Sequence, residues 1–280
     1  MSLKRILKQS RSARDSDLIV TPRLDEWLAR NGNIEPSKEV IQRVIWPELG
    51  TPQRDRTMTF SASSRGACPR AQVFYFTPVK AIPPLNPDLH AIFHDGTFRH
   101  MRWQMWLLEA GVLDDVEVFV KHDPLWLTGT IDGVGTIPYD LGSRMVPAEE
   151  PVPDTFGWEL KGCNSRKFRF VLDEGPDLAH LLQVHAYFHA RPDIDFWSLC
   201  YENKDTQEWK EFVVSRDQRL MDQVEQEIYD LQGYVLNEKL PVVLDECKKK
   251  QGKFKTCPFA HACLSTTEWP SKTRKIRRKP

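Results

Sequence analysis

The order in which helical and strand-like apolar patterns follow one another constrains the fold of this chain more than any other feature. Apolar residues at helical spacing predict a helix over residues 88–111, in which Gly96 is a candidate position for a break. Alternating or continuous apolar runs predict five strands, the first two forming a hairpin, at residues 116–122, 125–137, 155–162, 196–203 and 206–215. Further helical patterns cover residues 177–190 and 216–237. This order predicts an α/β domain with a central mixed sheet flanked by helices.

The segments outside this pattern differ in composition. Residues 1–59 are polar, interrupted by prolines, and hold one short amphipathic stretch at residues 24–29, so we expect an N-terminal extension that is basic at its start. The sequence PAEEPVPD at residues 147–154 predicts a surface loop. We place the main domain at residues 60–264 and a basic tail at residues 265–280.

The charged residues are balanced in number but unevenly distributed. The chain has 39 Lys and Arg against 39 Asp and Glu, a total that argues against a nucleic-acid partner. Residues 1–14 and 265–280, however, each carry a net charge of +5, which leaves −10 for residues 15–264. This pattern suits termini that contact a polyanion and a body whose carboxylates serve another purpose, such as metal binding. Solvated, inert tails are the alternative.

The apolar content sets the class of protein. At 40% hydrophobic residues the chain can build a substantial core, which excludes wholesale disorder. No run of about 18 apolar residues occurs, and no apolar stretch follows the basic start. We therefore expect no membrane partner and a cytoplasmic location.

The six cysteines fall into two groups. Cys163 and Cys200 lie in apolar or strand-like surroundings, where a free cysteine is typically a small buried hydrophobe. The other four lie in SSRGACPRAQ and in ECKKKQGKFKTCPFAHAC: Cys68, Cys247, Cys257 and Cys263. Four thiolates can hold a tetrahedral zinc or a 4Fe-4S cluster, and the spacing does not choose between these or unrelated thiols.

Two carboxylates and a lysine fall on neighbouring predicted strands. Asp132 lies in the apolar run 125–137, and Glu159 and Lys161 alternate within WELKG. Because residues i and i+2 of a strand point to the same face, Glu159 and Lys161 project into one site. Such a set can bind a divalent metal, hold a scissile phosphate and position an attacking water. A solvent-facing Glu-x-Lys pair is the ordinary alternative, but uncompensated charge on so apolar a strand is costly and favours a site.

Three further residues belong to the same pattern. His100 lies on the helix before these strands, and Gln183 and Tyr187 lie one turn apart on the helix after them, hence on one helix face. Each of the three, taken alone, is typical of an ordinary surface or core residue.

Six motifs follow one another in a specific order: SASSRGACPRAQ, GTFRH, LTGTIDGV, WELKG, QVHAY and CPFAHAC. Together they resemble the RecB-like branch of the PD-(D/E)XK nuclease superfamily. The chain looks most like the iron-sulfur exonucleases of that branch, which include the CRISPR-associated RecB-like exonucleases, the AddB nuclease domain and phage-encoded relatives. The resemblance covers roughly residues 60–264 and implies a restriction-endonuclease-like core.

The resemblance also implies roles for the site residues. His100, Asp132 and Glu159 would bind one or two Mg²⁺ or Mn²⁺ ions, with the backbone carbonyl of Leu160 completing the shell. Lys161 would orient or help deprotonate the attacking water and stabilise the pentacovalent phosphate. The remaining pair, Gln183 and Tyr187, would hold the DNA strand and the lysine in register.

The four cysteines outside the apolar strands would, by the same resemblance, ligate a 4Fe-4S cluster, with zinc as the alternative. The cluster would join the segment before the catalytic core to the C-terminal end, a constraint that removes much chain entropy. Family members often leave two residues between the second and third cysteines, whereas nine separate Cys247 from Cys257 here. If Cys247 does not ligate, His261 is the nearby alternative.

Basic and aromatic residues near the motifs predict contacts with DNA. The cations are Arg65, Arg70, Arg166, Lys167 and Arg169, and the basic tails add to them. In NSRKFRF, stacking by Phe168 and Phe170 suits a single strand. A strand or turn with alternating buried aromatics is the alternative interpretation of this segment.

These features predict a metal-dependent DNA exonuclease that acts on single-stranded ends in recombination, repair or end processing. One alternative is a nuclease that trims DNA within a CRISPR adaptation complex, whose proteins would be its partners. A second is a non-catalytic DNA-binding or assembly module, which the complete His, Asp, Glu and Lys set disfavours. The sequence does not predict the oligomeric state.

Overall fold

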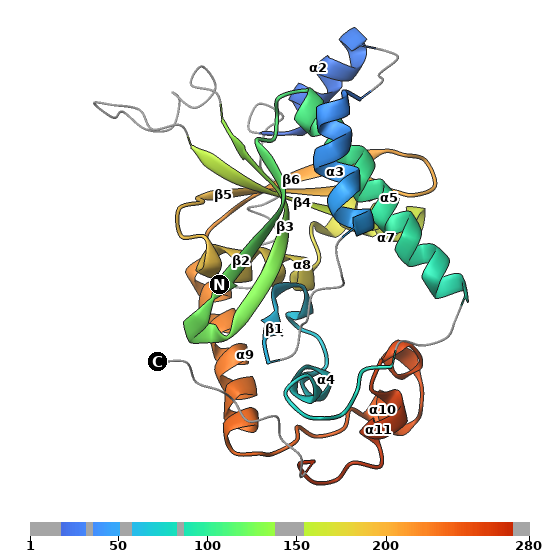
Figure 1. Ribbon diagram of the computed structural model, residues 1–280, viewed down its shortest axis with the longest axis vertical. Helices are drawn as coiled ribbons and strands as arrows, with labels where there is room; N and C mark the ends of the chain where they lie inside the picture. The colour runs from blue at the N-terminus through green and yellow to red at the C-terminus, as the bar shows by residue number, and fades with distance from the viewer. Residues whose placement is uncertain (1–17, 32–35, 51–57, 83–86, 138–153, 271–280) are drawn as a thin grey trace.

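The computed structural model describes residues 18–31, 36–50, 58–82, 87–137 and 154–270 (Figure 1). The α-helices are α2 (Thr21–Asn31), α3 (Lys38–Gly50), α4 (Pro69–Phe74), α5 (Pro87–Glu109), α7 (Ser165–Glu174), α8 (Leu178–Ala190), α9 (Gln218–Leu236), α10 (Asp245–Lys248) and α11 (Ala260–Cys263). The strands are β1 (Phe60–Ser61), β2 (Asp115–His122), β3 (Leu127–Thr136), β4 (Thr155–Cys163), β5 (Phe196–Asn203) and β6 (Trp209–Ser215). Short 3₁₀ turns cover Ala62–Ser64, Asp123–Leu125 and Gly252–Thr256.

The six strands form one mixed sheet in the order β1-β3-β4-β5-β6, with β2 paired to β3. The β1–β3 and β4–β5 pairs are parallel, and the other pairs are antiparallel. The predicted α/β architecture with a central mixed sheet is confirmed, and the predicted strands correspond to β2–β6. No described helix is long and apolar enough to cross a bilayer.

Strand β3 has an interrupted edge, and this interruption positions the site. One edge of β3 pairs with β2 from Leu127 to Val134. The other edge pairs with β1 at residues 127–128 and with β4 at residues 133–136. Within the described sheet, residues 129–132 therefore face a gap between β1 and β4. An opening in a sheet leaves backbone groups that side chains must satisfy.

Two apolar cores lie against the sheet. The first packs α8 and α9 against strand residues such as Ile131, Trp197 and Leu199. The second packs α2, α3 and α5 against Phe156, Trp158 and Leu160, with Trp103 at its centre. Figure 1 shows the β2–β3 hairpin running from the α9 side of the molecule to the α2–α3 side. Residues of α2 and α3, which the sequence places in an extension, thus contribute to the second core.

Two local features of the fold differ from interpretations that the sequence allowed. Helix α5 runs through Gly96 without a break. The segment NSRKFRF at residues 164–170, for which a strand or turn was the alternative to a DNA contact, is not a strand: residues 165–174 form helix α7. Its N-cap is Asn164, whose side chain accepts a 2.9 Å hydrogen bond from the Lys167 amide, and such a cap favours a helix over a strand. The predicted loop at residues 147–154 lies, apart from Asp154, outside the described residues, as do residues 1–14 and 271–280.

Candidate metal centre

Asp132 lies where β3 and β4 part. The β3–β4 pairing ends at Gly133 and Trp158, and beyond it Asp132 Oδ2 accepts a 2.8 Å hydrogen bond from the Leu160 amide. The other carboxylate oxygen, Oδ1, lies 3.3 Å from His100 Nδ1 on α5. Asp132 is buried, and its carboxylate replaces the backbone contact that the parted strands have lost. Leu160, whose carbonyl was expected to face a metal, is engaged here through its N–H.

Glu117 on β2 joins this pair, although the sequence did not single it out. The hairpin pairs Val116 with Gly133 and Val118 with Ile131 but omits a pair between Glu117 and Asp132. Glu117 has a φ of 52°, a left-handed conformation that is rare for a residue with a side chain. Val116 packs into the second core and Val118 against the first, so the strand changes face at Glu117.

One ligand atom each from His100, Glu117 and Asp132 lie within 4.8 Å of one another. Among the residues that the structure describes, no other group of three His, Cys, Asp or Glu side chains is as compact. The group borders a cavity of about 250 Å³, which is also lined by Gly96, Thr97, Met101 and Gln104. One imidazole and two carboxylates suit a divalent cation such as Mn²⁺ or Mg²⁺, so the donor set fits the metal expected from the sequence.

Gln104 fixes the orientation of Glu117. Its Nε2 donates hydrogen bonds of 2.7 Å to Glu117 Oε1 and 3.0 Å to the Asp132 carbonyl. Gln104 is fully buried and lies one turn after His100 on α5. The same one-turn spacing that paired Gln183 with Tyr187 could have identified this glutamine from the sequence. Glu117 had no such signal, because its place in the alternation of β2 is that of an ordinary surface residue.

The remaining predicted catalytic residues form a hydrogen-bonded network between β4 and α8. Lys161 Nζ lies 2.7 Å from Glu159 Oε1 and 2.8 Å from Gln183 Oε1. Gln183 Nε2 in turn donates to Glu159 Oε1 at 2.7 Å and to Tyr187 Oη at 3.2 Å. Tyr187 donates to the Thr130 carbonyl at 2.6 Å, within the gap of β3.

Glu159 is the one member of the network with an unused oxygen. Its Oε2 is buried and accepts no hydrogen bond from the described residues. A buried carboxylate oxygen without a partner is costly, so this atom is available to a cation or a donor that enters the site. The network thus supplies a further candidate ligand beside the His100–Glu117–Asp132 group.

The three ionisable groups nearest the gap have shifted pKa values. Burial and the neighbouring Asp132 charge raise the pKa of Glu159 to about 7, against the opposing effect of Lys161. Burial disfavours the charged forms of His100 and Asp132, but their mutual attraction and hydrogen bond outweigh it. The pKa of His100 rises to about 9, and that of Asp132 falls below its usual value. His100 must therefore lose a proton before it can bind a metal.

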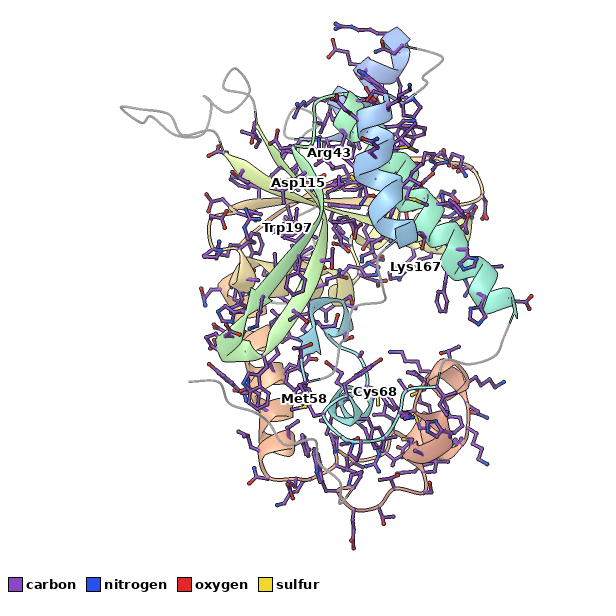
Figure 2. The ribbon with its side chains drawn as sticks, in the orientation of Figure 1. Arg43, Met58, Cys68, Asp115, Lys167 and Trp197 are labelled. Carbon is purple, nitrogen blue, oxygen red and sulfur yellow. The ribbon has the colours of Figure 1, made fainter. Side chains whose placement is uncertain are left out.

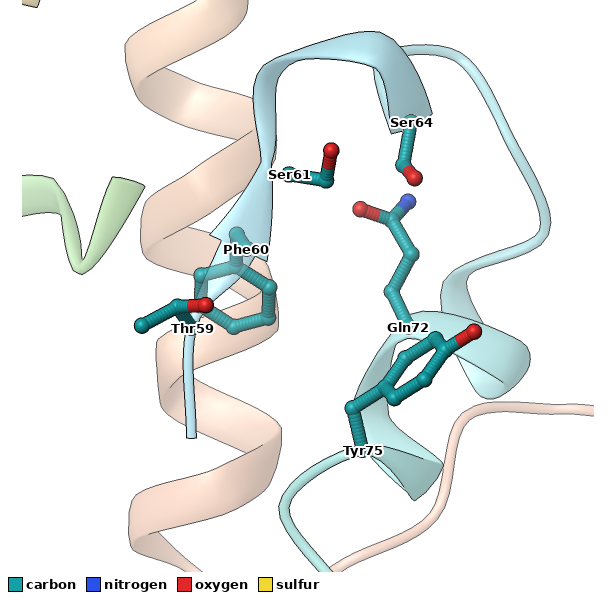
Figure 3. A pocket seen from close by; sticks show the side chains of 6 residues that line it. All are labelled: Thr59, Phe60, Ser61, Ser64, Gln72 and Tyr75. Atoms are coloured by element: carbon teal, nitrogen blue, oxygen red, sulfur yellow. The ribbon is translucent and has the colours of Figure 1, made fainter. Parts of the chain in front are cut away.

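Three of the predicted DNA contacts are interior residues. Arg65 is buried, hydrogen bonds to the side chain of Gln72, and lies 3.3 Å from a Glu227 carboxylate oxygen. Gln72 also lines a cavity of about 20 Å³ with Ser61 and Ser64, and Figure 3 shows these polar groups pointing toward one another. This guanidinium is thus engaged within the protein and not presented to phosphate.

Arg70 and Phe168 are also placed inside. Arg70 is buried and donates to the carbonyls of Pro241, Cys263 and Thr266. Phe168 packs in the first core. The same helix α7 exposes Arg166, Arg169 and Phe170, and Lys167 Nζ lies 4.7 Å from the Phe170 ring centre.

The four cysteines outside the apolar strands come together on one cavity. Cys68, Cys247, Cys257 and Cys263 line it with apolar side chains of Ala71, Phe74, Leu244, Phe254 and Phe259. Figure 2 shows Cys68 in the part of the molecule where α4 approaches α10 and α11. No three of the four sulfur atoms form a compact group within 4.8 Å. His261 is exposed and does not line the cavity, whereas Cys200 is buried as expected.

The donor chemistry of this cavity suits a soft metal or an iron-sulfur cluster. Tetrahedral zinc with bonds of about 2.3 Å would hold its sulfurs about 3.8 Å apart. In a 4Fe-4S cluster each cysteine binds a different iron, so the sulfurs are held farther apart than around one ion. Among the described residues, no three of the sulfurs are as close together as one tetrahedral zinc ion would hold them.

Comparisons with known proteins add little to these contacts. No family model and no curated protein matches the chain. Among solved structures, SSO0001 is 15% identical with a TM-score of 0.43, over 81% of this chain and 95% of that one. The alkaline exonuclease LHK-Exo from Laribacter hongkongensis is 13% identical with a TM-score of 0.44, over 65% and 90% of the two chains. Its complex with dAMP is 14% identical with a TM-score of 0.35, over 84% and 87%. Likenesses of this size assign neither a family nor an activity.

Proposed function

We propose that the protein is a metal-dependent DNA exonuclease of the RecB-like, iron-sulfur branch of the PD-(D/E)XK superfamily. It hydrolyses phosphodiester bonds from single-stranded ends during recombination, repair or end processing in the cytoplasm. One observation carries the proposal. Six residues named from four separate motifs, spread over nearly ninety positions, lie around a single gap in the sheet: His100, Asp132, Glu159, Lys161, Gln183 and Tyr187. A non-catalytic module has no evident need for that convergence.

The contacts support a distinct task for each residue. When bound, a divalent cation supplies positive charge to the scissile phosphate and acidifies a water molecule. His100, Asp132 and Glu159 offer the nitrogen and oxygen ligands for it. Lys161 is fixed by Glu159 and Gln183, so its ammonium group is preorganised to orient the attacking water and stabilise charge on the phosphate. Tyr187 fixes β3 at the gap through the Thr130 carbonyl.

The exposed face of α7 supplies DNA contacts. Arg166 and Arg169 offer cations to the phosphates, and the half-exposed Phe170 ring offers a stacking surface. Lys167 is half-buried and its Nζ lies 2.7 Å from Asp177 Oδ2, so it would contact a phosphate by leaving that ion pair. These residues of α7 replace Arg65, Arg70 and Phe168, which the fold uses internally. The convergence of Cys68, Cys247, Cys257 and Cys263 on one cavity supports a 4Fe-4S cluster beside the nuclease core. Recombination proteins, or the proteins of a CRISPR adaptation complex, are the corresponding partner classes.

The test is a nuclease assay on end-labelled linear single- and double-stranded DNA, with circular DNA to separate exonuclease from endonuclease activity. We expect Asp132→Ala, Glu159→Ala and Lys161→Met to lower cleavage about 100-fold or more while DNA binding persists. Asp195→Ala, which removes an exposed carboxylate away from the gap, should cleave like the wild type. Full activity of any of the three site variants would contradict the assignment.

A further inference from the structure

We propose that Glu117 is a metal ligand of this site, on the β2 side of Asp132. The inference rests on the divalent metal of the proposed function but assigns a residue that the motif pattern does not include. The direct observation is geometric. A carboxylate oxygen of Glu117 completes the compact group with His100 and Asp132, whereas Glu159 lies outside that group.

Sheet register places three carboxylates at one level of three adjacent strands. The pairs on both sides of Glu117 put it opposite Asp132 across β2 and β3. The β3–β4 register, continued by one residue beyond Gly133 and Trp158, puts Glu159 opposite Asp132 on the other side. Asp132 is thus flanked by Glu117 and Glu159. Three carboxylates at one level of the sheet repel one another; His100 and Lys161 offset part of this repulsion, and a divalent cation beside Asp132 would offset more of it.

The surroundings of Glu117 hold its carboxylate toward the cavity. Gln104 binds Glu117 Oε1 and the Asp132 carbonyl through the same amide nitrogen. The other amide atom, Gln104 Oε1, is fully buried without a hydrogen-bond partner among the described residues, and Gln104 is one of the residues that line the cavity with Glu117. Glu159 Oε2 is likewise buried without a partner, so the residues on both sides of Asp132 each hold or contact a polar group with an unmet hydrogen-bonding requirement.

The backbone of Glu117 is consistent with selection for ligand placement over stability. Its left-handed φ of 52° is a conformation that glycine adopts without cost and glutamate does not. The turn of the strand at this residue needs the conformation but not the carboxylate. A glycine would meet the backbone requirement better, so the side chain must contribute something else.

Two substitutions in the full-length protein separate these roles, with Mn²⁺ as the probe. Glu117→Gln keeps the shape and the contact with Gln104 but removes the charge. We expect Mn²⁺ affinity, measured by calorimetry or by paramagnetic resonance of free Mn²⁺, to fall about tenfold or more. Asp115→Asn removes an exposed carboxylate of the same strand and should leave Mn²⁺ affinity unchanged.

Glu117→Gly should raise the thermal midpoint measured in EDTA, because it relieves the left-handed strain, and should abolish most of the rise in midpoint that Mn²⁺ gives the wild type. Wild-type Mn²⁺ affinity in Glu117→Gln would overturn the inference. If His100→Ala and Asp132→Asn lose Mn²⁺ in the same series, the proposed metal site would still stand. Conversely, loss of Mn²⁺ in Glu117→Gln, in a protein whose wild type cleaves no DNA, would support the inference and refute the nuclease proposal.

Discussion

His180 shows how a single half-buried side chain couples this fold to pH. Its Nδ1 lies 2.7 Å from Tyr201 Oη, and that oxygen also accepts a 3.1 Å hydrogen bond from the Asp177 amide. The imidazole and the hydroxyl can each be the donor in this contact, depending on the tautomer of His180. Burial, together with the positive charge of Lys161, lowers the pKa of His180 to about 3.

The depressed pKa gives a stability prediction. A histidine in the unfolded chain has a pKa near 6.5. Between about pH 6.5 and pH 3 the unfolded state therefore binds a proton that the folded state does not, and the free energy of unfolding decreases as the pH is lowered. At pH 5 the loss from this one group is about 2 kcal/mol. We expect His180→Gln to narrow the difference in thermal midpoint between pH 7.5 and pH 5.

The control for this prediction is His90→Gln, which replaces an exposed histidine of α5 and should keep the wild-type difference. Comparing each protein with itself at two pH values removes any loss of stability common to both. An unchanged difference in His180→Gln would show that this histidine is not the acid-sensitive group.

The site residues differ in how much of their placement the sequence contains. Glu159 and Lys161 share a face because strands alternate, and that periodicity is visible in WELKG. By the same alternation Glu117 is an ordinary surface position, because no residue near it in the sequence indicates its left-handed backbone. Arg65 and Arg70 mislead for a related reason: a cation in a sequence does not identify its partner. For Arg70 the partners are carbonyls about 170 to 196 residues away.

The two halves of helix α5 differ in burial. From Arg99 to Leu108 it packs into the second core, while its first half is exposed. The apolar periodicity of the sequence predicts a helix but does not distinguish the half that packs from the half that does not. In that exposed half, Phe93 is 60% exposed and Phe98 is 65% exposed. Exposed aromatic rings beside a proposed nuclease site suit base stacking.

The two rings lie on different faces of α5. Phe93 precedes His100 by seven residues, which places it on the same face about 10 Å along the axis. Phe98 precedes His100 by two residues, about 200° around the helix. If DNA enters the site along α5, Phe93 contacts it and Phe98 does not. Two residues of similar exposure on one helix thus form a matched pair.

We therefore predict that Phe93→Ala weakens binding of single-stranded DNA about tenfold, as expected from the loss of one stacked base. Phe98→Ala should bind like the wild type. Fluorescence anisotropy with a labelled oligonucleotide, in EDTA to prevent cleavage, measures both. Equal effects of the two substitutions would exclude a DNA path along this face of α5.

For the whole molecule, the notable contact joins α4 to the last described part of the chain. Phe74, Phe259 and Cys263 form a small separate apolar cluster. Arg70 adds hydrogen bonds to three carbonyls beyond the last long helix, α9. The element order of the sequence predicted the sheet, but no local pattern could predict this closure. It depends on contacts between segments roughly 180 residues apart. The one indication in the sequence was the pattern of cysteines, which grouped Cys68 with three cysteines near residue 255 as ligands of one site.

The cysteine cavity lies at this closure, so its metal content should affect both colour and stability. If a 4Fe-4S cluster binds there, protein purified without oxygen is brown, and Cys257→Ser loses the colour and the iron. Removing a crosslink that closes so long a loop costs up to about 4 kcal/mol by chain-entropy reasoning, so the thermal midpoint should fall as well.

Cys163→Ser replaces a half-buried cysteine that does not line the cavity and should change neither property. A colourless wild type with one zinc per chain would identify the occupant as zinc. Wild-type iron content in Cys257→Ser would instead remove this cysteine from the ligand set, and with it the explanation of why four thiols converge where α4 meets the segment after α9.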